Sequence, residues 1–283
     1  MRWCSIKTAD GHQGAVLVQD RLITFHELNA CTGATISEQL LDVIQLSDIS
    51  ALEGVVMKAA EKDAIGERNN SIRFCAPFYS PPKIIGIGLN YREHAVDLGA
   101  QTPTEPTSFM KPRTTIIGPG DTIVLPVESE RVTAEAELGI IIGKRCKRVS
   151  EENVDSVIFG YVPVLDMTAE DILQRNPRFL TRAKSFDTFF SFGPIILTPD
   201  EIKDLPNLTI NTVLNGKSVK SNQIRNMMFS PKRIVSFFSN VLTFEPGDII
   251  STGTPGAVPV KNGDVVECRI DGFPNLSNPV GGE

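Results

Sequence analysis

The chain has 283 residues, of which 41% are hydrophobic and 22% charged, and its formal net charge is −6. These values are ordinary for a globular protein with a large core. No basic run is dense enough to indicate a nucleic-acid partner, no apolar stretch approaches the ~20 residues that span a bilayer, and the start lacks the apolar segment of a signal peptide. Five scattered cysteines without CxxC spacing are expected to be reduced thiols, which favours the cytoplasm.

Residues 1–75 are predicted to form a small N-terminal α+β domain. Residues 14–24 have the pattern of two short strands joined by a turn. Apolar residues at helical spacing predict helices over 37–44 and 50–60. Three prolines within residues 76–82 exclude a helix and favour an extended linker.

Residues 76–283 are predicted to form a second domain made mostly of strands. A short helix is expected over 91–99, and a longer one over 231–241, where Ser230 is a suitable cap. Glycines and a proline at 118–121 indicate a turn. Strands are expected at 83–89, 138–142, 157–165, 194–197, 208–214, 248–251 and 265–270. Many short strands with few helices favour a closed or rolled β architecture, so the predicted fold class is α+β, mostly β.

Two carboxylates, Glu135 and Glu137, lie two residues apart in an otherwise apolar run that is predicted to be a strand. Side chains at this spacing share one face of a strand, where two acids repel each other unless a cation lies between them. A third acid, Asp166, ends another apolar run. Oxygen ligands without Cys or His nearby suit Mg²⁺, Mn²⁺ or Ca²⁺. The alternative is a solvated strand face that happens to carry two glutamates.

His94 lies in the short predicted helix that follows the strand at 83–89, and Asp97 comes three residues later. On a helix both side chains would point to one side. A histidine paired with a carboxylate can act as a general base. The alternative is a surface pair on a short helix, and the spacing alone leaves both open. His12 and His26 belong to the N-terminal unit and are expected to be structural or exposed.

Two lysines and one turn are further candidates for the binding of an anion. Lys111 stands between Met110 and a proline, and Lys184 stands among small and apolar residues. Beside a carboxylate-bound cation, either lysine would hold an anionic substrate oxygen, whereas lysines on solvated loops are the usual case. The hydroxyls and backbone N–H groups of residues 252–256 could hold a carboxylate or form an ordinary loop. Gly86 and Gly88 lack the third glycine of a dinucleotide site.

Taken together, an ordered set of segments over about residues 76–280 resembles the fumarylacetoacetate hydrolase family. The segments are Lys83–Tyr91 with His94, Phe109–Pro112, Ile117–Pro119, Glu135–Glu137, Phe159–Tyr161, Asp166, Lys184–Asp187, Gly193–Pro194, Leu214–Gly216, Glu245–Pro255 and Asn278–Val280. Each segment alone is a weak match, and the set in this order and spacing is a strong one.

The resemblance implies a rolled mixed β-sheet as the catalytic domain, usually in a homodimer. It implies a divalent cation, commonly Mg²⁺, Mn²⁺ or Ca²⁺, held by Glu135, Glu137 and Asp166. The implied substrates are small 2-oxo or 2,4-dioxo acids, which the family cleaves at a C–C bond through an enolate held at the metal. His94 would lie on a helix that closes over the substrate as a lid. Oriented by Asp97, it would activate water.

Further roles are implied by the same resemblance. Lys184 would stabilise the developing enolate, and Thr254 would contact the substrate carboxylate. Lys111 would lie near the site, and Tyr91 would belong with it to the substrate-binding residues.

The chain departs from the family pattern at several positions. Asp97 stands where a glutamate is common, so its side chain is shorter by one methylene group. Leu165 and Glu170 stand where the family often has Asn and Arg, which removes an expected contact to a distal substrate carboxylate and introduces a like charge. Arg182 lies nearby in sequence and would compensate.

Three functions remain open on the sequence. The first is a metal-dependent hydrolase of acylpyruvate-type acids. The second is an oxaloacetate-type decarboxylase or a 2-hydroxyhepta-2,4-diene-1,7-dioate isomerase on the same scaffold, because one enolate serves all of these reactions. The third is a binding protein that kept the metal site and lost catalysis, against which the presence of His94 and Lys184 counts.

Overall fold

The computed structural model describes residues 1–9, 11–19, 21–46, 49–60, 72–97 and 99–282. The first strands are β1 (Arg2–Thr8), β2 (Gly11–Val18), β3 (Arg21–Thr24), β4 (Ile84–Gly88), β5 (Thr107–Lys111), β6 (Ile116–Ile117), β7 (Ile123–Leu125), β8 (Val132–Ile142) and β9 (Ile158–Ala169). They are followed by β10 (Phe190–Phe192), β11 (Ile195–Leu197), β12 (Thr209–Leu214), β13 (Lys217–Gln223), β14 (Ile249–Ser251), β15 (Val258–Val260), β16 (Val265–Ile270) and β17 (Leu276–Gly282). The α-helices are α1 (Phe25–Thr32), α2 (Leu40–Leu46), α3 (Ile49–Ala60), α4 (Arg92–Asp97), α5 (Glu170–Arg175), α6 (Leu180–Lys184) and α7 (Pro231–Val241).

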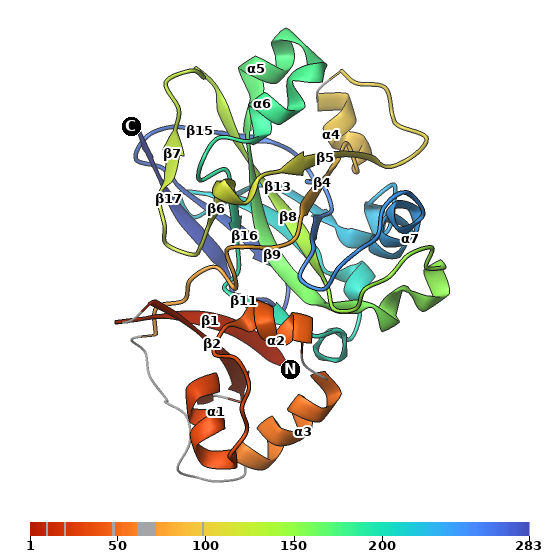
Figure 1. Ribbon diagram of the computed structural model, residues 1–283. Coiled ribbons are helices and arrows are strands. Elements are labelled where there is room, and N and C mark those ends of the chain that lie inside the picture. The colour runs from red at the N-terminus through yellow and green to blue at the C-terminus, as the bar shows by residue number, and fades with distance from the viewer. Residues whose placement is uncertain (10, 20, 47–48, 61–71, 98, 283) are drawn as a thin grey trace.

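The strands form two open sheets (Figure 1). The larger sheet follows the order β3-β2-β1-β11-β9-β8-β14-β4-β5, with β6, β10 and β15 attached beside this path, and the smaller one follows β13-β12-β16-β17-β7. The predicted class, α+β with mostly β structure, is confirmed, and the sheets are open instead of closed into a barrel. Among the described residues, no helix has both the length and the apolar character needed to cross a membrane.

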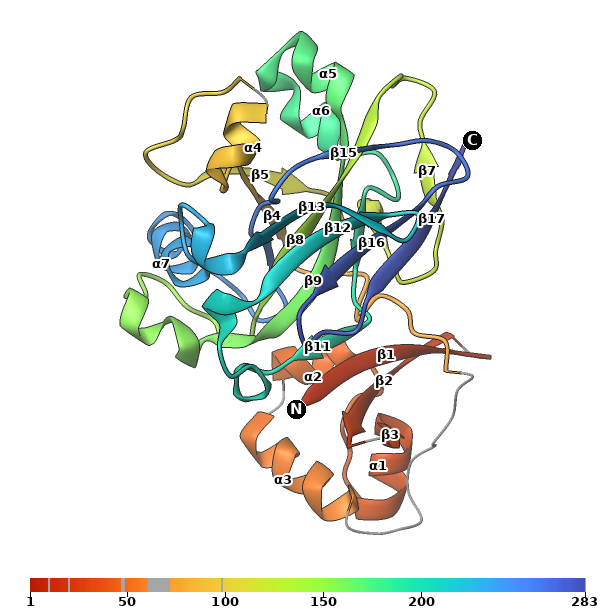
Figure 2. The same ribbon diagram turned by 180° about the vertical axis from the view of Figure 1, so that it is seen from behind.

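The N-terminal strands extend the sheet of the larger region. β1 pairs antiparallel with β11, placing Trp3 opposite Ile196, and the ring of Trp3 lies 5.8 Å from that of Phe159 between centroids. In Figure 2 the β1–β2 hairpin lies directly beneath β11, with α1 and α3 on the far side. The two regions therefore share one sheet and one hydrophobic core, and a domain boundary at residue 75 stays a prediction.

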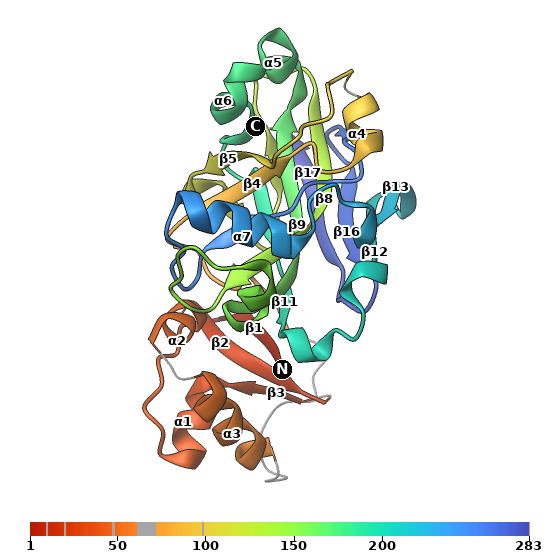
Figure 3. The same ribbon diagram turned by 90° about the vertical axis from the view of Figure 1, so that its right-hand side faces the viewer.

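The β8–β9 pair is the central ladder, and all residues of both strands are buried. Even-numbered residues of β8, from Ala134 to Ile142, belong to one core cluster. Odd-numbered residues face the other side, where Ile141 packs in the second core. Figure 3 shows the ladder between α7 on one side and β12 and β16 on the other. Alternation of side chains along the strand places Thr133, Glu135 and Glu137 together on that second face.

Several predicted elements are confirmed at close to the expected bounds. The helix at 231–241 is α7, and the Arg233 N–H donates to the capping oxygen Ser230 Oγ at 3.2 Å. The strands within 14–24 are β2 and β3, with residue 20 outside the described residues. The segment at 76–82 contains no helix, as predicted, and its residues from Ala76 to Phe78 are buried. The Ser5 hydroxyl donates to Pro77 O at 2.7 Å, so this linker is part of the packed structure.

Other elements differ from the prediction. β9 continues past Leu165 to Ala169, because residues 166–169 pair with β8 down to Val132. Asp166 therefore lies inside a strand. Elements that the sequence pattern did not predict are β1, β5, β6, β7, β10, β13, β15, β17, α1, α5 and α6. The three-residue strands β10 and β15 are too short to show any periodicity in sequence.

Candidate functional site

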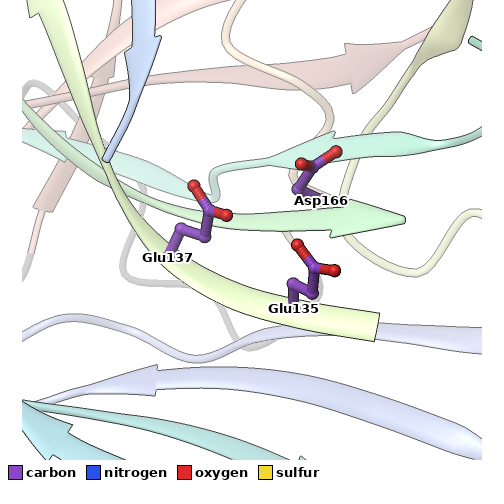
Figure 4. A group of neighbouring side chains, drawn as sticks. All are labelled: Glu135, Glu137 and Asp166. Atoms are coloured by element: carbon purple, nitrogen blue, oxygen red, sulfur yellow. The ribbon is translucent and has the colours of Figure 1, made fainter. Parts of the chain in front are cut away.

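The structure brings the three predicted metal ligands together in one buried cluster. Glu135 lies directly opposite Asp166 in the β8–β9 register, and Glu137 follows two residues along β8 on the same face. One carboxylate oxygen from each residue lies within 4.8 Å of the other two. Figure 4 shows the three side chains converging from the two strands. Their exposed fractions are 7% for Glu135, 1% for Glu137 and zero for Asp166, so the alternative of a solvated strand face is wrong.

Two lysines hold the Asp166 side of this cluster. The Lys184 ammonium donates to Glu135 Oε2 at 2.8 Å and to Asp166 Oδ2 at 2.7 Å. Lys111 Nζ donates to the other oxygen, Asp166 Oδ1, at 2.6 Å. The Thr168 hydroxyl donates to Glu135 Oε1 at 2.9 Å. Asp166 therefore has both oxygens paired with ammonium groups.

Glu137 is held by hydroxyl and backbone groups instead. Ser251 Oγ and the Gly253 N–H, which lies at 2.8 Å, both donate to Glu137 Oε2. Gly253 has φ +93°, and a Cβ there would lie 2.8 Å from the Cβ of Asn90. A residue with a side chain would therefore be both strained and crowded at this position. The predicted turn at residues 252–256 thus supports a metal ligand.

The charges of the cluster fit a hard divalent cation. Three carboxylates face two lysine ammonium groups, which leaves one negative charge uncompensated. Burial, followed by the neighbouring charge of Asp166, raises the pKa of Glu137 to about 8. Burial would also raise the pKa of Asp166, but Lys111 and Lys184 outweigh it and hold that pKa below its usual value. Buried carboxylate oxygens with excess negative charge are the donors that Mg²⁺, Mn²⁺ and Ca²⁺ prefer.

A cavity of about 490 Å³ opens beside the acidic cluster. Its size is in the range of small-molecule sites. The predicted residues Glu135, Glu137, His94, Lys184 and Thr254 all line it. The other lining residues are Ile87, Gly88, Leu89, Ala100, Thr107, Ser108, Phe109, Glu170, Leu173, Gln174, Pro177 and Leu180. Lys184 Nζ also lies 4.9 Å from the centroid of the Phe109 ring, which packs against its charge.

His94 is a buried imidazole in the wall of this cavity. Only 5% of the residue is exposed, and burial, reinforced by the charge of Lys184, lowers its pKa. Its Nδ1 atom is buried without a hydrogen-bond partner among the described residues. A neutral imidazole can accept a proton near neutral pH, as a general base must.

The segment before α4 is fixed by Asn90. Its side-chain amide donates to Thr252 O at 2.8 Å and to Phe229 O at 3.0 Å, and its Oδ1 accepts from the Phe229 N–H. The loop that carries His94 is thereby joined to the turn that supports Glu137. His94 and Glu137 are thus positioned by one hydrogen-bonded unit.

The structure places Asp97 away from His94. Its carboxylate forms an ion pair with Lys220 of β13, and Glu93 accepts a hydrogen bond from Asn222 of the same strand at 3.3 Å. Within the described parts of the chain, no hydrogen bond joins Asp97 to His94. The orienting role of Asp97 stays a prediction.

The remaining predicted residues fall into two groups. Lys111 and Thr254 are buried at the site; Thr254 Oγ1 exchanges hydrogen bonds with the backbone of Gly256 at 3.2 Å. Tyr91 is fully buried, and its hydroxyl has no hydrogen-bond partner within the described structure. Arg182 is exposed on α6. Neither Tyr91 nor Arg182 lines the cavity, and their roles in substrate binding stay predictions.

Sequence reasoning missed the hydrogen-bonding partners Thr168 and Ser251 and the cavity residues Leu173 and Gln174. Thr168 lies two residues after Asp166, on the same face of β9, so the length of this strand would have revealed it. Leu173 and Gln174 belong to α5, a six-residue helix without a strong periodic signal.

Comparisons with known proteins agree with this site. The family model "Fumarylacetoacetate (FAA) hydrolase C-terminal" matches residues 83–281. A mitochondrial oxaloacetate tautomerase of Xenopus laevis is 38% identical over 240 residues, which are 82% of this chain and 75% of that protein. A maleylpyruvate hydrolase of Sphingobium sp. SYK-6, solved in complex with manganese(II) and pyruvate, is 30% identical with a TM-score of 0.81 over 100% of this chain and 99% of that one.

A third relative carries a different activity. A 2-hydroxyhepta-2,4-diene-1,7-dioate isomerase of Mycobacterium marinum is also 30% identical, with a TM-score of 0.75 over 100% of this chain and 99% of that one. The named activities of these relatives are thus tautomerisation, hydrolysis and isomerisation. The match over most of the chain, together with the shared fold, confirms the resemblance found in the sequence: this chain belongs to the fumarylacetoacetate hydrolase family.

Proposed function

We propose that this protein is a divalent-metal-dependent hydrolase that cleaves a C–C bond of small 2,4-dioxo acids. The observation that carries the proposal is one cavity lined by a buried histidine, a carboxylate cluster and a lysine. The 30% identical maleylpyruvate hydrolase, whose structure contains manganese(II) and pyruvate, supports it.

Glu135, Glu137 and Asp166 would hold the cation, which we propose is Mg²⁺ or Mn²⁺, with Ca²⁺ as a further candidate. When bound, such a cation supplies positive charge that polarises the 2-oxo group of the substrate. The apolar cavity walls exclude water from the rest of the substrate, which strengthens every electrostatic interaction there.

His94 takes a proton from water, whose oxygen adds to the distal carbonyl carbon. The bond between that carbon and C3 of the pyruvyl part then breaks, and its electron pair forms the enolate of pyruvate. Lys184 supplies positive charge to the enolate oxygen, and Thr254 binds the substrate carboxylate. Protonation at C3 completes the reaction, so one acylpyruvate and one water yield pyruvate and a carboxylic acid.

A second candidate is favoured by the position of Asp97. Its carboxylate is paired with Lys220, and within the described structure it makes no hydrogen bond that would orient His94. Proton transfer at C3 of a 2-oxo acid needs no activated water. Isomerisation of a dienedioate or the tautomerisation or decarboxylation of oxaloacetate would then be the reaction, in line with the named activities of two relatives.

A turnover panel separates these functions. Acetylpyruvate, fumarylpyruvate, oxaloacetate and a 2-hydroxydienedioate are each incubated with Mn²⁺, with Mg²⁺ and with a chelator. We expect metal-dependent loss of acetylpyruvate with equal formation of pyruvate and acetate. Consumption of oxaloacetate or the dienedioate alone would reject hydrolysis in favour of the second candidate. Undiminished turnover in the chelator would reject the metal site itself.

We also propose that the protein acts as a homodimer in the cytoplasm. Cys4, Cys75, Cys146 and Cys268 are free thiols, which suits a reducing compartment, and dimers are usual in the family. Light scattering coupled to size-exclusion chromatography would test the dimer; a mass of one chain would reject it.

A further inference from the structure

The cavity has a second charged end, at the start of α5. Glu170 is the first residue of this helix and lines the cavity together with Leu173, Pro177 and Leu180. Its backbone N–H donates to Arg131 O at 2.8 Å. Arg131 precedes Glu135 by four residues, which is about 13 Å along a strand. Glu170 therefore lies at the opposite end of the cavity from the acidic cluster.

Glu170 is firmly held in this position. The residue is 8% exposed, and its carboxylate forms an ion pair with Arg131 Nε. The Arg131 side chain is half exposed and does not line the cavity. Arg131 therefore fixes Glu170 from the outside while the glutamate faces the substrate space.

Among the described residues, no unpaired lysine or arginine lines this end of the cavity. Among the described residues that line it, Lys184 is the only lysine or arginine, and its ammonium is bound to Glu135 and Asp166. The wall around Glu170 is apolar apart from Gln174. A ligand carboxylate placed there would lose its hydration without gaining a partner inside the cavity, and it would lie against the carboxylate of Glu170, whose partner Arg131 lies outside the cavity.

We propose that Glu170 sets the substrate class: the site accepts 2-oxo acids whose far end is uncharged and rejects those with a second carboxylate. This inference rests on the proposed function, because it assumes that the 2-oxo acid end lies at the Glu135–Asp166 cluster. It assigns to this chain acylpyruvates with an alkyl or other neutral acyl group, and it disfavours fumarylpyruvate, oxaloacetate and dienedioates.

Binding of ligands that are not cleaved tests the proposal without relying on turnover. Isothermal titration calorimetry of the Mn²⁺-loaded protein compares 2-oxohexanoate with 2-oxoadipate, which have six carbons each and differ in a terminal methyl or carboxylate. Pyruvate, which has no far end, reports on the metal end alone. The variants are Glu170→Gln, which keeps a hydrogen-bond acceptor for Arg131, and Glu170→Arg. Glu130→Gln, which removes a neighbouring exposed acid outside the cavity, is the matched control.

We expect the wild-type protein and Glu130→Gln to prefer 2-oxohexanoate by at least about tenfold. Glu170→Gln should cut this preference by about tenfold, and Glu170→Arg should reverse it, while pyruvate binds all four proteins alike. Equal affinities for the two six-carbon acids in the wild-type protein, or an unchanged ratio in Glu170→Gln, would overturn the inference and leave the hydrolase proposal standing. Failure of pyruvate to bind any of the proteins would overturn both proposals.

Discussion

The β1–β3 hairpins and the β8–β9 ladder belong to the same sheet but bury different kinds of side chain. The buried residues of the hairpins are mainly apolar, such as Trp3, Val16 and Ile23, and the ion pairs at their edge, such as that of Lys7 with Asp121, are exposed to solvent. The ladder buries three carboxylates. Burying charge is costly unless it is paired, and in the ladder Lys111 and Lys184 provide the pairing.

The comparison predicts that the two regions respond differently to substitution. Changes in the ladder should alter metal binding and turnover more than folding. Changes in the hairpins should alter folding and leave turnover per folded molecule intact.

The largest effect is expected from Glu137→Gln. It removes a ligand charge, so turnover should fall on the order of 1,000-fold or more. Because it also removes an acid whose pKa is raised to about 8 by burial and by Asp166, the metal-free fold should be no less stable than wild type. Thermal unfolding with chelator and with Mn²⁺ measures both effects: the stabilisation by Mn²⁺ should be present in the wild-type protein and absent in the variant. Full retention of that stabilisation would exclude Glu137 as a ligand.

His94→Ala is expected to lower hydrolysis by about 10²–10⁴-fold, the usual contribution of a general base. The base must be neutral, and burial lowers the pKa of His94, so its neutral form persists to more acidic pH than that of a free imidazole. The acid limb of kcat/KM should therefore lie below pH 6.5 in the wild-type protein and disappear in the variant. A wild-type limb above pH 6.5, or one that survives in His94→Ala, would assign it to another group.

Trp3→Ala tests whether the β1–β3 hairpins contribute to stability alone. Trp3 is fully buried against Phe25 and Phe159, and its truncation should cost about 3–5 kcal/mol of unfolding free energy. Urea unfolding measures this loss, and kcat at saturating metal, expressed per folded molecule, should be unchanged. A large fall in that kcat would show that the hairpins also shape the active site.

The smallest effect is expected from Asp97→Asn. Its ion pair with Lys220 is half exposed, with side-chain exposures of 46% and 36%, so the loss of stability should be below about 1 kcal/mol. Turnover should fall by less than about tenfold if the carboxylate stays on Lys220. A fall of 100-fold or more would mean that Asp97 acts on His94 during the reaction.

The sequence predicted the acidic cluster because its signal is local. Two glutamates at strand spacing must share a face, and the length of the apolar run made a strand the only plausible element. Asp166 was found through the family resemblance and the end of its apolar run, although the strand continues past it. The class of fold also followed from short strands and turn residues.

The resemblance placed Lys111 and Lys184 at the site, but the sequence pattern did not predict which acid each lysine meets. Lys111 lies 55 residues from Asp166, and Lys220 lies 123 residues from Asp97. Whether a lysine at such a distance meets one acid or another depends on strand order. That order depends in turn on strands without periodicity, such as β5, and on β13, whose mostly exposed residues gave no apolar pattern.

The two polar contacts between β13 and α4 have a consequence for the response of the protein to salt. Lys220 and Asn222 lie on one face of their strand and hold the helix that carries His94 through groups reached by solvent. Dissolved ions screen an attraction of this kind at a Debye length of about 8 Å under physiological conditions. The contacts that hold α4 should therefore weaken in concentrated salt, whereas the ion pairs buried in the β8–β9 ladder are shielded from dissolved ions.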